Sequence, residues 1–463
     1  MSREIQDSLW GAGSELVLIH SEGSRTSIKL FENQPFLFIH SHVHNSSDKA
    51  RSISTLEVLN AKVSINGQAL KSFGTGGLEE LTNGTGSYTV HALVNGDSRN
   101  GLVSGSLTHN QGVGTFFPSE GGGLKANIDF GNFEIDAKNS RDTDTLIFGF
   151  FEDARIGLET YADIVAKQEG VKLAPLPNVY CTWYHKRASD EATLQRNTEF
   201  ADQQLKPFGL NVMQIDDEWQ SLLPKDFEHE GEIPLTGPIK AFIDTNENYP
   251  SGMAHTAKMI DSHGMVPGIW FMPFAGNYAN PYFDHDVFAK TAEGEAYHDA
   301  RWSGTCVDAT SPKGAKFIYD RTKRIHDWGY RYFKIDGLHT GMPSKNIYVS
   351  TGYKDQNFGD SILHDSKSTH IQAYRKGLQI LRDAAPDTFV LGCNVSQNMM
   401  SMGPAFGLLE AMRIGPDNGN AGKGSWDQVT LGAWHGTNLY FLNKRVWHND
   451  PDPIYVREQN PME

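Results

Sequence analysis

The stretch Tyr330–Leu338, which reads YRYFKIDGL, predicts a buried strand that ends in charged residues. Its aromatic and β-branched residues favour a strand. Where that strand should end, the chain presents Lys334 and Asp336, and Gly337 then permits a turn. Two buried charges are costly unless they are paired or take part in binding or catalysis. The pattern therefore indicates either an ordinary ion pair at a strand end or a functional site.

Strand-like and helix-like runs alternate around this stretch. We predict strands at residues 178–183, 210–215, 266–271, 330–335, 389–393, 409–414 and 445–448. We predict helices at residues 190–205, 253–263, 312–328, 369–384 and 424–442. Repeated strand–helix units predict a (β/α)8-type barrel. A doubly wound open sheet is the alternative, but no glycine-rich phosphate loop follows the first strand.

The first third of the chain has a different residue pattern. Short alternating runs such as 15–20, 36–40 and 145–150 are separated by Gly, Ser and Asn, which predicts an N-terminal β-sandwich. A helix is expected at residues 155–169, and the Pro-containing segment 173–177 follows it. We therefore predict a multidomain α/β plus all-β protein, with a β-sandwich domain at 1–172 and a (β/α) barrel domain at 173–463.

Composition limits the partners. The 463 residues carry a net charge of -15, which argues against a nucleic-acid partner. No run approaches 18 apolar residues, so we expect no membrane span. Three scattered cysteines argue against a disulfide framework. The start carries no hydrophobic signal core, so we expect a cytoplasmic protein, or a periplasmic one whose signal was removed.

Polar residues fall at the ends of the predicted strands. They are Trp183, Asp216, Asp217, Lys334, Asp336, Cys393, Asn394, Arg413, Asp417, Asn449, Asp450 and Asp452. The carboxyl ends of barrel strands form one rim, where the chemistry of such folds is found. Carboxylates accept hydrogen bonds from hydroxyl groups and tryptophan stacks on apolar ring faces, so the rim suits a neutral carbohydrate.

Six motifs in order resemble glycoside hydrolase family 36, the α-galactosidase type, which is related to family 27. They are CTWYH at Cys181, QIDDEWQ at Gln214, GIWFMPF at Gly268, YFKIDG at Tyr332, RIGPD at Arg413 and WHNDPD at Trp447. The resemblance covers about residues 178–455, and the preceding β domain matches the layout of that family.

The resemblance implies roles for individual residues. It implies that Asp336 is the nucleophile and Asp417 the general acid/base. It implies that the substrate is bound by Trp183, Asp216, Asp217, Trp270, Lys334, Cys393, Asn394, Arg413 and Asp450. Two positions depart from the common pattern of the family: Ile335 stands where K-W-D has tryptophan, and Glu218 where D-D-G-W has glycine.

The implied function is an exo-acting retaining glycosidase that cleaves terminal α-galactosides, or a close relative, by double displacement. We expect Asp336 to be ionised beside Lys334, and Asp417 to be kept protonated by its surroundings. An inverting enzyme remains open, because the sequence does not give the separation of the carboxyl groups. No metal and no cofactor are required.

Several alternatives remain. The chain could be a sugar-binding protein derived from such an enzyme, or a metal-dependent glycosyltransferase that uses Asp450 and Asp452. Asp216 and Asp217 could cap a helix, and Asp417 could belong to a turn with Asn418 and Gly419.

The sequence after the seventh predicted strand is short. Only residues 453–463 remain, so we expect a barrel that is truncated before its eighth strand. Exposed strand edges would favour association with a neighbouring chain, which makes a homo-oligomer possible.

Overall fold

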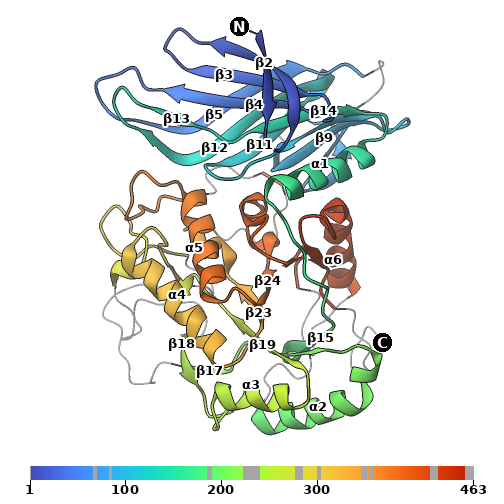
Figure 1. Ribbon diagram of the computed structural model, residues 1–463, viewed down its shortest axis with the longest axis vertical. Helices are drawn as coiled ribbons and strands as arrows, with labels where there is room; N and C mark the ends of the chain where they lie inside the picture. The colour runs from blue at the N-terminus through green and yellow to red at the C-terminus, as the bar shows by residue number, and fades with distance from the viewer. Residues whose placement is uncertain are drawn as a thin grey trace.

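The architecture is seen in a computed structural model that describes residues 2–65, 70–82, 86–184, 190–222, 240–276, 285–299, 304–345, 352–353, 358–417 and 426–453. Figure 1 shows antiparallel sheets from the first part of the chain above a parallel sheet with helices from the rest. Three parts of the sequence predictions lie outside the described ranges: His185 of the CTWYH motif, Asn418 with Gly419, and residues 454–463.

The first 151 residues form two antiparallel sheets. The larger sheet has ten strands in the order β1 (Ser2–Asp7), β2 (Gly11–Ile19), β3 (Arg25–Phe31), β4 (Leu37–His44), β14 (Leu146–Phe151), β10 (Gly101–Ser106), β9 (Val90–Asn95), β6 (Leu70–Gly74) and β7 (Gly77–Glu80), with β13 (Ser140–Asp142) beside β4. The smaller sheet has the order β5 (Arg51–Lys62), β12 (Gly123–Ile135), β11 (Val113–Ser119) and β8 (Ser87–Tyr88).

One hydrophobic core joins these two sheets. It includes Ile39 and Phe148 from the larger sheet and Phe116 and Phe130 from the smaller one. The core residues alternate along β12, whereas β9, β10 and β14 are buried on both faces. Helix α1 (Ala154–Gln168), close to the helix predicted at 155–169, packs against β10 and β14.

The rest of the chain builds a parallel sheet. Its seven strands run in sequence order: β15 (Val179–Cys181), β16 (Val212–Ile215), β19 (Val266–Phe271), β23 (Tyr332–Asp336), β24 (Phe389–Cys393), β25 (Ala411–Arg413) and β26 (His448–Asp450). The helices are α2 (Glu191–Gln204), α3 (Met253–Ser262), α4 (Pro312–Asp327), α5 (His370–Ala384) and α6 (Trp426–Asn438). Small strands are β17 (Gln220–Leu222), β18 (Lys240–Thr245), β20 (Ala275–Gly276), β21 (His298–Asp299) and β22 (Gly304–Cys306).

Strand order decides between the two folds considered from the sequence. A doubly wound sheet reverses its strand order at a switch point. Here consecutive strands are neighbours throughout the described sheet, so the doubly wound alternative is wrong. The side chains of Val212, Tyr332, Leu391 and Ala411 form one cluster, because the sheet curls and brings its inner face together.

The seventh strand lies later than predicted. It was expected at residues 445–448 but forms at His448–Asp450. A turn occupies the predicted range: the amide of Lys444, whose φ is 61°, donates to the carbonyl of Trp447 at 2.7 Å. The buried Val446 and Trp447 fill core positions in this turn and not in the sheet.

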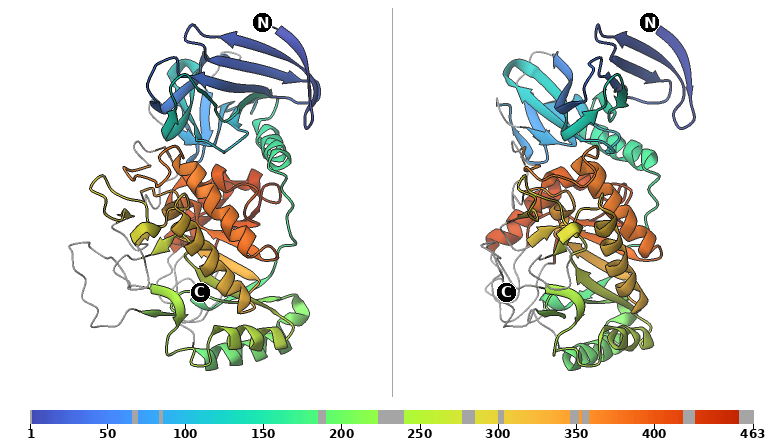
Figure 2. Two further views of the ribbon diagram at one scale, coloured as in Figure 1. Left: turned by 60° about the vertical axis from the view of Figure 1, so that its left-hand side comes forward. Right: turned by 90° about the vertical axis from the view of Figure 1, so that its left-hand side faces the viewer.

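Ion pairs connect the antiparallel sheets and α1 to the parallel part. Arg375 on α5 pairs with Glu169 at 2.9 Å, and Arg445 pairs with Glu159 on α1 at 2.8 Å. The views in Figure 2 agree that the sheets lie over one end of the parallel part, with an extended segment after α1 joining them. The predicted division at 172 and 173 falls in that segment and stays a prediction.

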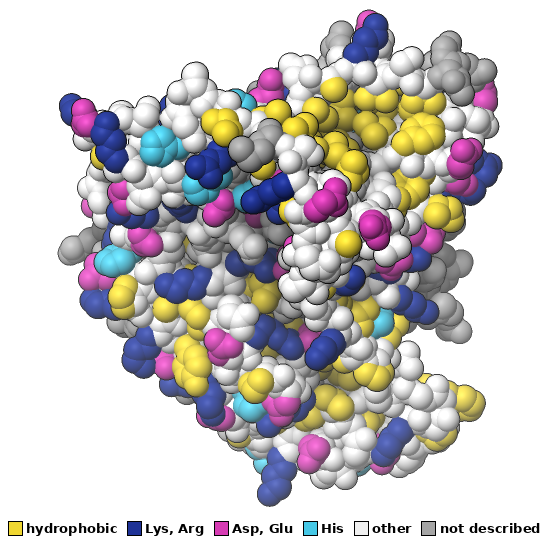
Figure 3. All heavy atoms as spheres, turned by 45° about the horizontal axis from the view of Figure 1, so that its top comes forward, with side chains coloured by type: hydrophobic (Ala, Val, Ile, Leu, Met, Phe, Trp, Pro, Cys, Tyr) yellow, Lys and Arg dark blue, Asp and Glu magenta, His cyan; other side chains and the backbone are white. Residues whose placement is uncertain are grey.

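The surface mixes charges of both signs. Figure 3 shows Lys and Arg side chains interspersed with Asp and Glu side chains over the face on view. Within the described ranges, no helix combines the length and apolar character that crossing a membrane requires.

Candidate active site

The seven parallel strands bring the predicted residues to one edge of the curled sheet. Register places Lys334 beside Trp270, Asp336 beside Cys393, and Arg413 beside Asp450. Side chains alternate between the two faces of a strand, so residues two positions apart share a face. Tyr332 lies in the inner cluster, and therefore Lys334 and Asp336 also belong to the inner face.

A buried ion pair occupies the first half of this rim. The ammonium group of Lys334 lies 2.9 Å from Asp216 Oδ2, and their side chains are 7% and 4% exposed. The sequence suggested an ion pair between Lys334 and Asp336, but the direct partner of Lys334 is Asp216. These two residues belong to β23 and to the end of β16, with β19 between them, so the pair spans the concave face.

Asp216 has further donors. The side-chain amide of Gln214 donates to Oδ2 at 2.6 Å, and the thiol of Cys181 lies 3.3 Å from the same oxygen. Burial alone raises the pKa of Asp216, but the Lys334 ammonium and the hydrogen bonds from the Asp217 amide and the Cys181 thiol hold it below its usual value. The Asp216 charge in turn keeps the pKa of Lys334 well above its usual range, against the effect of burial. Both groups are therefore charged at neutral pH.

Asp217 does not cap a helix, since the described chain continues from it into β17. Its Oδ1 accepts hydrogen bonds from the amide of Glu218 at 2.8 Å and from the side chain of Gln220 at 2.7 Å. Trp219, two residues after Asp217, is fully buried and its indole N–H donates to the carbonyl of Trp270 at 2.8 Å. The double-aspartate turn is thus tied to the end of β19.

Asp336 is oriented by three donors. Trp270 Nε1 donates to Oδ2 at 3.1 Å, while the Gly337 amide and Gln397 Nε2 donate to Oδ1 at 2.7 and 2.6 Å. Burial raises the pKa of Asp336, Lys334 lowers it, and the charge of Asp417 raises it again, with a net shift upwards. The carboxylate is therefore fixed in direction and electrostatically coupled to Asp417.

Asn394 and Cys393 line the rim differently from the carboxylates. Asn394 is buried, and its Oδ1 accepts the amide of Gln397 at 3.1 Å, so it holds the residue that orients Asp336. Burial and the nearby Asp336 charge raise the pKa of the Cys393 thiol well above its usual value. A neutral thiol of this kind is a wall residue and not a nucleophile.

Arg413 holds the second half of the rim together. Its guanidinium group is buried and lies 2.6 Å from Asp417 Oδ1 and 3.0 Å from Asp452 Oδ2. Asp452 is 1% exposed, whereas Asp417 is 56% exposed. The side chain of Asp417 contacts the cationic Arg413 and is open to solvent, and the expectation that it is protonated stays a prediction.

Tyr184 links the two halves. It lies in a 3-10 helix (Thr182–Tyr184) directly after β15, its hydroxyl donates to Asp452 Oδ1, and the Lys334 ammonium lies 5.6 Å from the centre of its ring. Trp183, predicted to contact substrate, is partly buried in the same turn. Asp450 accepts the amide of Asp452 at 2.9 Å.

The sequence analysis did not propose four residues of this rim as candidates, and it named a fifth, Asp452, only at a strand end and as a possible metal ligand. Cys181 and Gln214 could have been found, because each lies on the inner face two positions before a residue considered there. Tyr184, Gln397 and Asp452 lie in connections after strands, and their positions depend on tertiary packing. Asp452 is neutralised by Arg413, which leaves the Asp450–Asp452 metal motif without support, and the described residues contain no cluster of three metal-ligating side chains.

Comparison with solved structures identifies the fold. The α-galactosidase from Thermus thermophilus, in complex with p-nitrophenyl α-D-galactopyranoside, aligns with a TM-score of 0.60 at 19% identity over 96% of this chain and 85% of that chain. The α-galactosidase from Lactobacillus brevis aligns with a TM-score of 0.64 at 12% identity, over 96% of this chain and 60% of that one.

A third structure carries the name of the family. The family 36 (GH36) α-galactosidase AgaA from Geobacillus stearothermophilus, in complex with raffinose, aligns with a TM-score of 0.63 at 12% identity, over 95% of this chain and 62% of that one. No family model matches the chain. The chain thus has the fold of the family 36 α-galactosidases, which confirms the resemblance read from the motifs at the level of the fold.

Proposed function

We propose that the protein is an exo-acting, retaining glycoside hydrolase that cleaves terminal α-galactosides or a closely related α-glycoside. The observation that carries this proposal is the arrangement around Asp336. Three donors fix its carboxylate, and a second carboxylate, Asp417, lies close enough to influence its pKa. The structural neighbours are α-galactosidases, and several of them hold sugars.

In the proposed mechanism Asp336 attacks the anomeric carbon while Asp417 gives a proton to the departing glycosidic oxygen. The product of this step is a covalent glycosyl–Asp336 ester. Asp417, now ionised, takes a proton from water as that water attacks the anomeric carbon, and Asp336 leaves with its original charge. Each of the two displacements inverts the configuration at the anomeric carbon, so the product keeps the configuration of the substrate.

For the first step Asp417 must carry a proton and face the substrate, so it has to leave Arg413. In this exchange Asp452 stays with Arg413 and compensates its charge. Lys334, Asp216 and Asp217 are proposed to hold sugar hydroxyl groups, and Trp183 and Trp270 to face the apolar side of the ring.

The proposed layout also includes the finer points of the fold. We propose a β-sandwich domain at residues 1–172 and a barrel-type catalytic domain at 173–463. The carbohydrate substrate is proposed to enter at the carboxyl edge of the parallel strands.

The Arg413–Asp417 pair also favours a second candidate, a sugar-binding protein with little turnover. A panel of nitrophenyl glycosides separates the two, with Asp336→Ala beside the wild type. We expect hydrolysis of the α-galactoside by the wild type, and a fall in kcat of about 10^4-fold or more in the variant with an unchanged melting curve. Binding of galactosides without hydrolysis by the wild type would establish the second candidate. The anomer first released, observed by NMR, tests retention.

A further inference from the structure

A cavity with both apolar and polar lining lies between the antiparallel sheets and the loops of the parallel part. Its volume is about 540 Å³, within the range of roughly 300–1,000 Å³ that is typical of small-molecule sites. The sheet side is formed by residues of β5, β8 and β12, and the other side by residues that follow β23 and β24. Neither the sequence motifs nor the proposed mechanism uses this cavity.

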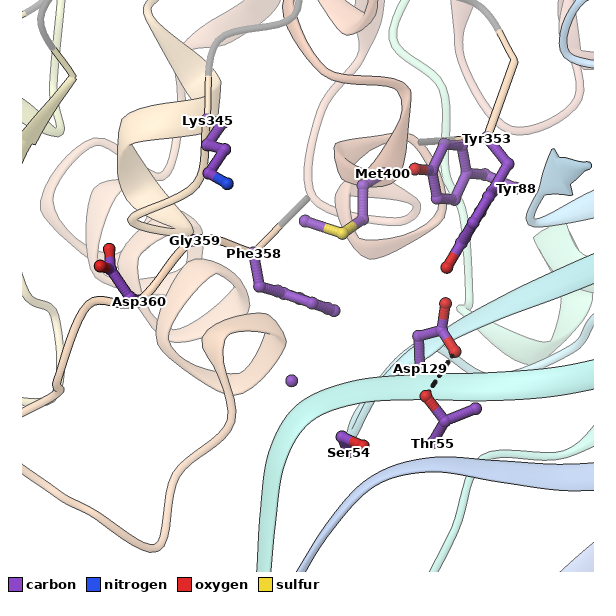
Figure 4. A pocket seen from close by; sticks show the side chains of 11 residues that line it. Ser54, Thr55, Tyr88, Asp129, Lys345, Tyr353, Phe358, Gly359, Asp360 and Met400 are labelled. Carbon is purple, nitrogen blue, oxygen red and sulfur yellow. Dashed lines mark hydrogen bonds between the residues drawn. The ribbon is translucent and has the colours of Figure 1, made fainter. Parts of the chain in front are cut away.

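Aromatic rings form one part of its lining. Figure 4 shows Tyr353 beside Tyr88, with Phe358 and Met400 nearby. The Tyr353 and Tyr88 rings are 5.2 Å apart, and Phe117 packs edge-on against Tyr353 at 4.7 Å. The amide of Tyr353 also donates to the carbonyl of Gly86 at 3.0 Å, so this ring is held against the sheet while remaining partly exposed.

Hydrogen-bonding groups form the rest of the lining. Asp129 accepts the Thr55 hydroxyl at 3.0 Å on the sheet side, the interaction dashed in Figure 4. Lys345 and Asp360 lie at the other end and are exposed, as are Ser54 and Thr55, so the cavity opens to solvent.

The charges narrow the class of ligand. The lining carries two carboxylates, Asp129 and Asp360, and one ammonium group, that of Lys345, and this balance disfavours phosphates and other anions. Carboxylates and hydroxyls accept and donate hydrogen bonds to ligand hydroxyls, and rigid aromatic rings pack against apolar ring faces. A neutral polyhydroxylated ring satisfies both parts of the lining.

The cavity is tied to the candidate active site through one short segment. Gln397, which donates to Asp336, lies three residues before Met400 of the cavity wall. Between them, Asn398 donates to the carbonyl of Lys345 at 3.1 Å and so joins the two loops that line the cavity. Both sites therefore lie beyond the carboxyl ends of β23 and β24.

We propose that this cavity is an accessory carbohydrate-binding site for the distal sugars of an oligosaccharide whose terminal sugar is held at Asp336. The inference rests on the proposed function for the terminal sugar, but the cavity can be tested without turnover. Such an accessory site distinguishes an oligosaccharide from a glycoside of a single sugar, because the single sugar occupies only the site at Asp336.

The kinetic test compares stachyose, a tetrasaccharide, with p-nitrophenyl α-galactopyranoside. Tyr353→Leu and Asp360→Ala should each raise KM for stachyose by about tenfold, the equivalent of about 1.4 kcal/mol, and leave the nitrophenyl substrate within twofold. Tyr319→Leu, which changes an exposed tyrosine of α4, is the matched control and should affect neither substrate. Equal effects on both substrates, or none on either, would overturn the proposal.

The binding test keeps the two proposals apart. Stachyose is titrated into the Asp336→Ala protein and into the same protein carrying Asp360→Ala as well, an exposed change that leaves the core intact. About tenfold weaker binding in the double variant supports the accessory site even if the wild type hydrolyses nothing. Unchanged binding overturns it even if the wild type is an active galactosidase.

Discussion

The two halves of the rim carry ionic groups of opposite design. Lys334 and Asp216 are both buried and enclosed by further donors, whereas Arg413 divides its charge between the buried Asp452 and the exposed Asp417. Removing a partner from an enclosed pair leaves an uncompensated charge. A shared cation can release one partner and keep the other. In the proposed mechanism the first half holds the ligand, and the second half moves a proton.

The enclosed pair should be the more costly to break. Lys334→Met leaves the buried Asp216 carboxylate with its hydrogen bonds from Gln214, Cys181 and the Asp217 amide but without its cation, and we expect the free energy of unfolding to fall by about 3–5 kcal/mol. Denaturant titration near pH 7 measures this. Lys316→Met, which breaks an exposed pair with Asp320 on α4, is the control and should change little. Full stability in Lys334→Met would contradict the enclosed character of the pair, and Lys334→Met/Asp216→Asn should recover much of the loss.

Asp417→Asn tests the exchangeable half. We expect kcat/KM to fall by about 10^2–10^4-fold for raffinose, which has a poor leaving group, and far less for an activated nitrophenyl galactoside, because only the former needs a proton from Asp417. Stability should hardly change, since Asp452 remains with Arg413. Asp452→Asn is the matched contrast: it removes the buried partner and should destabilise the protein more. An equal loss on both substrates would rule out the acid role.

The raised pKa of Asp336 gives a signature in pH. Its folded-state pKa lies above the unfolded value near 4, so the folded protein binds this proton more tightly. The stability contribution of Asp336 therefore falls as pH rises from about 4 through its folded pKa, and is level above that. Asp336→Asn cannot ionise, so the free energy of unfolding of the wild type minus that of the variant should decrease over this window.

Urea titrations of both proteins from pH 4 to 7 measure this difference. A difference that grows with pH would mean that Lys334 outweighs burial at Asp336. In that case the pKa of Asp336, like that of Asp216, would lie below its usual value.

The sequence predicted those features of the site that depend on residues close together in the chain, and it missed those that depend on tertiary packing. The first six strands and the inner-face residues Lys334 and Asp336 depend on alternation within a few residues, and these predictions agree with the structure, whereas the seventh strand lies later than predicted. The partner of Lys334 does not follow from any local pattern, because Asp216 reaches it across β19 only once the sheet has curled. The same holds for Gln397, which reaches Asp336 from a loop after the neighbouring strand.

The smallest effect on stability is expected at Glu218, in the turn that follows Asp216 and Asp217. Glu218 stands where the resembled family has glycine, and its φ of 77° falls in the region that favours glycine. A side chain at this φ destabilises the folded protein by about 1–2 kcal/mol. Glycine removes this strain, but its greater conformational freedom in the unfolded chain offsets about 0.4–1 kcal/mol of the gain. Glu218→Gly should therefore raise the free energy of unfolding by about 0.5–1 kcal/mol.

Glu218→Ala separates backbone strain from loss of the side chain, because alanine keeps the unfavourable φ. The Glu218 amide and carbonyl bond to Asp217 and Asn246 in either variant, so the position of the Asp216–Asp217 turn and kcat/KM should be preserved. Thermal and urea unfolding of the three proteins measure the difference. If the alanine and glycine variants are equally stable, the turn is relaxed, and the enclosed half holds its carboxylates without backbone strain.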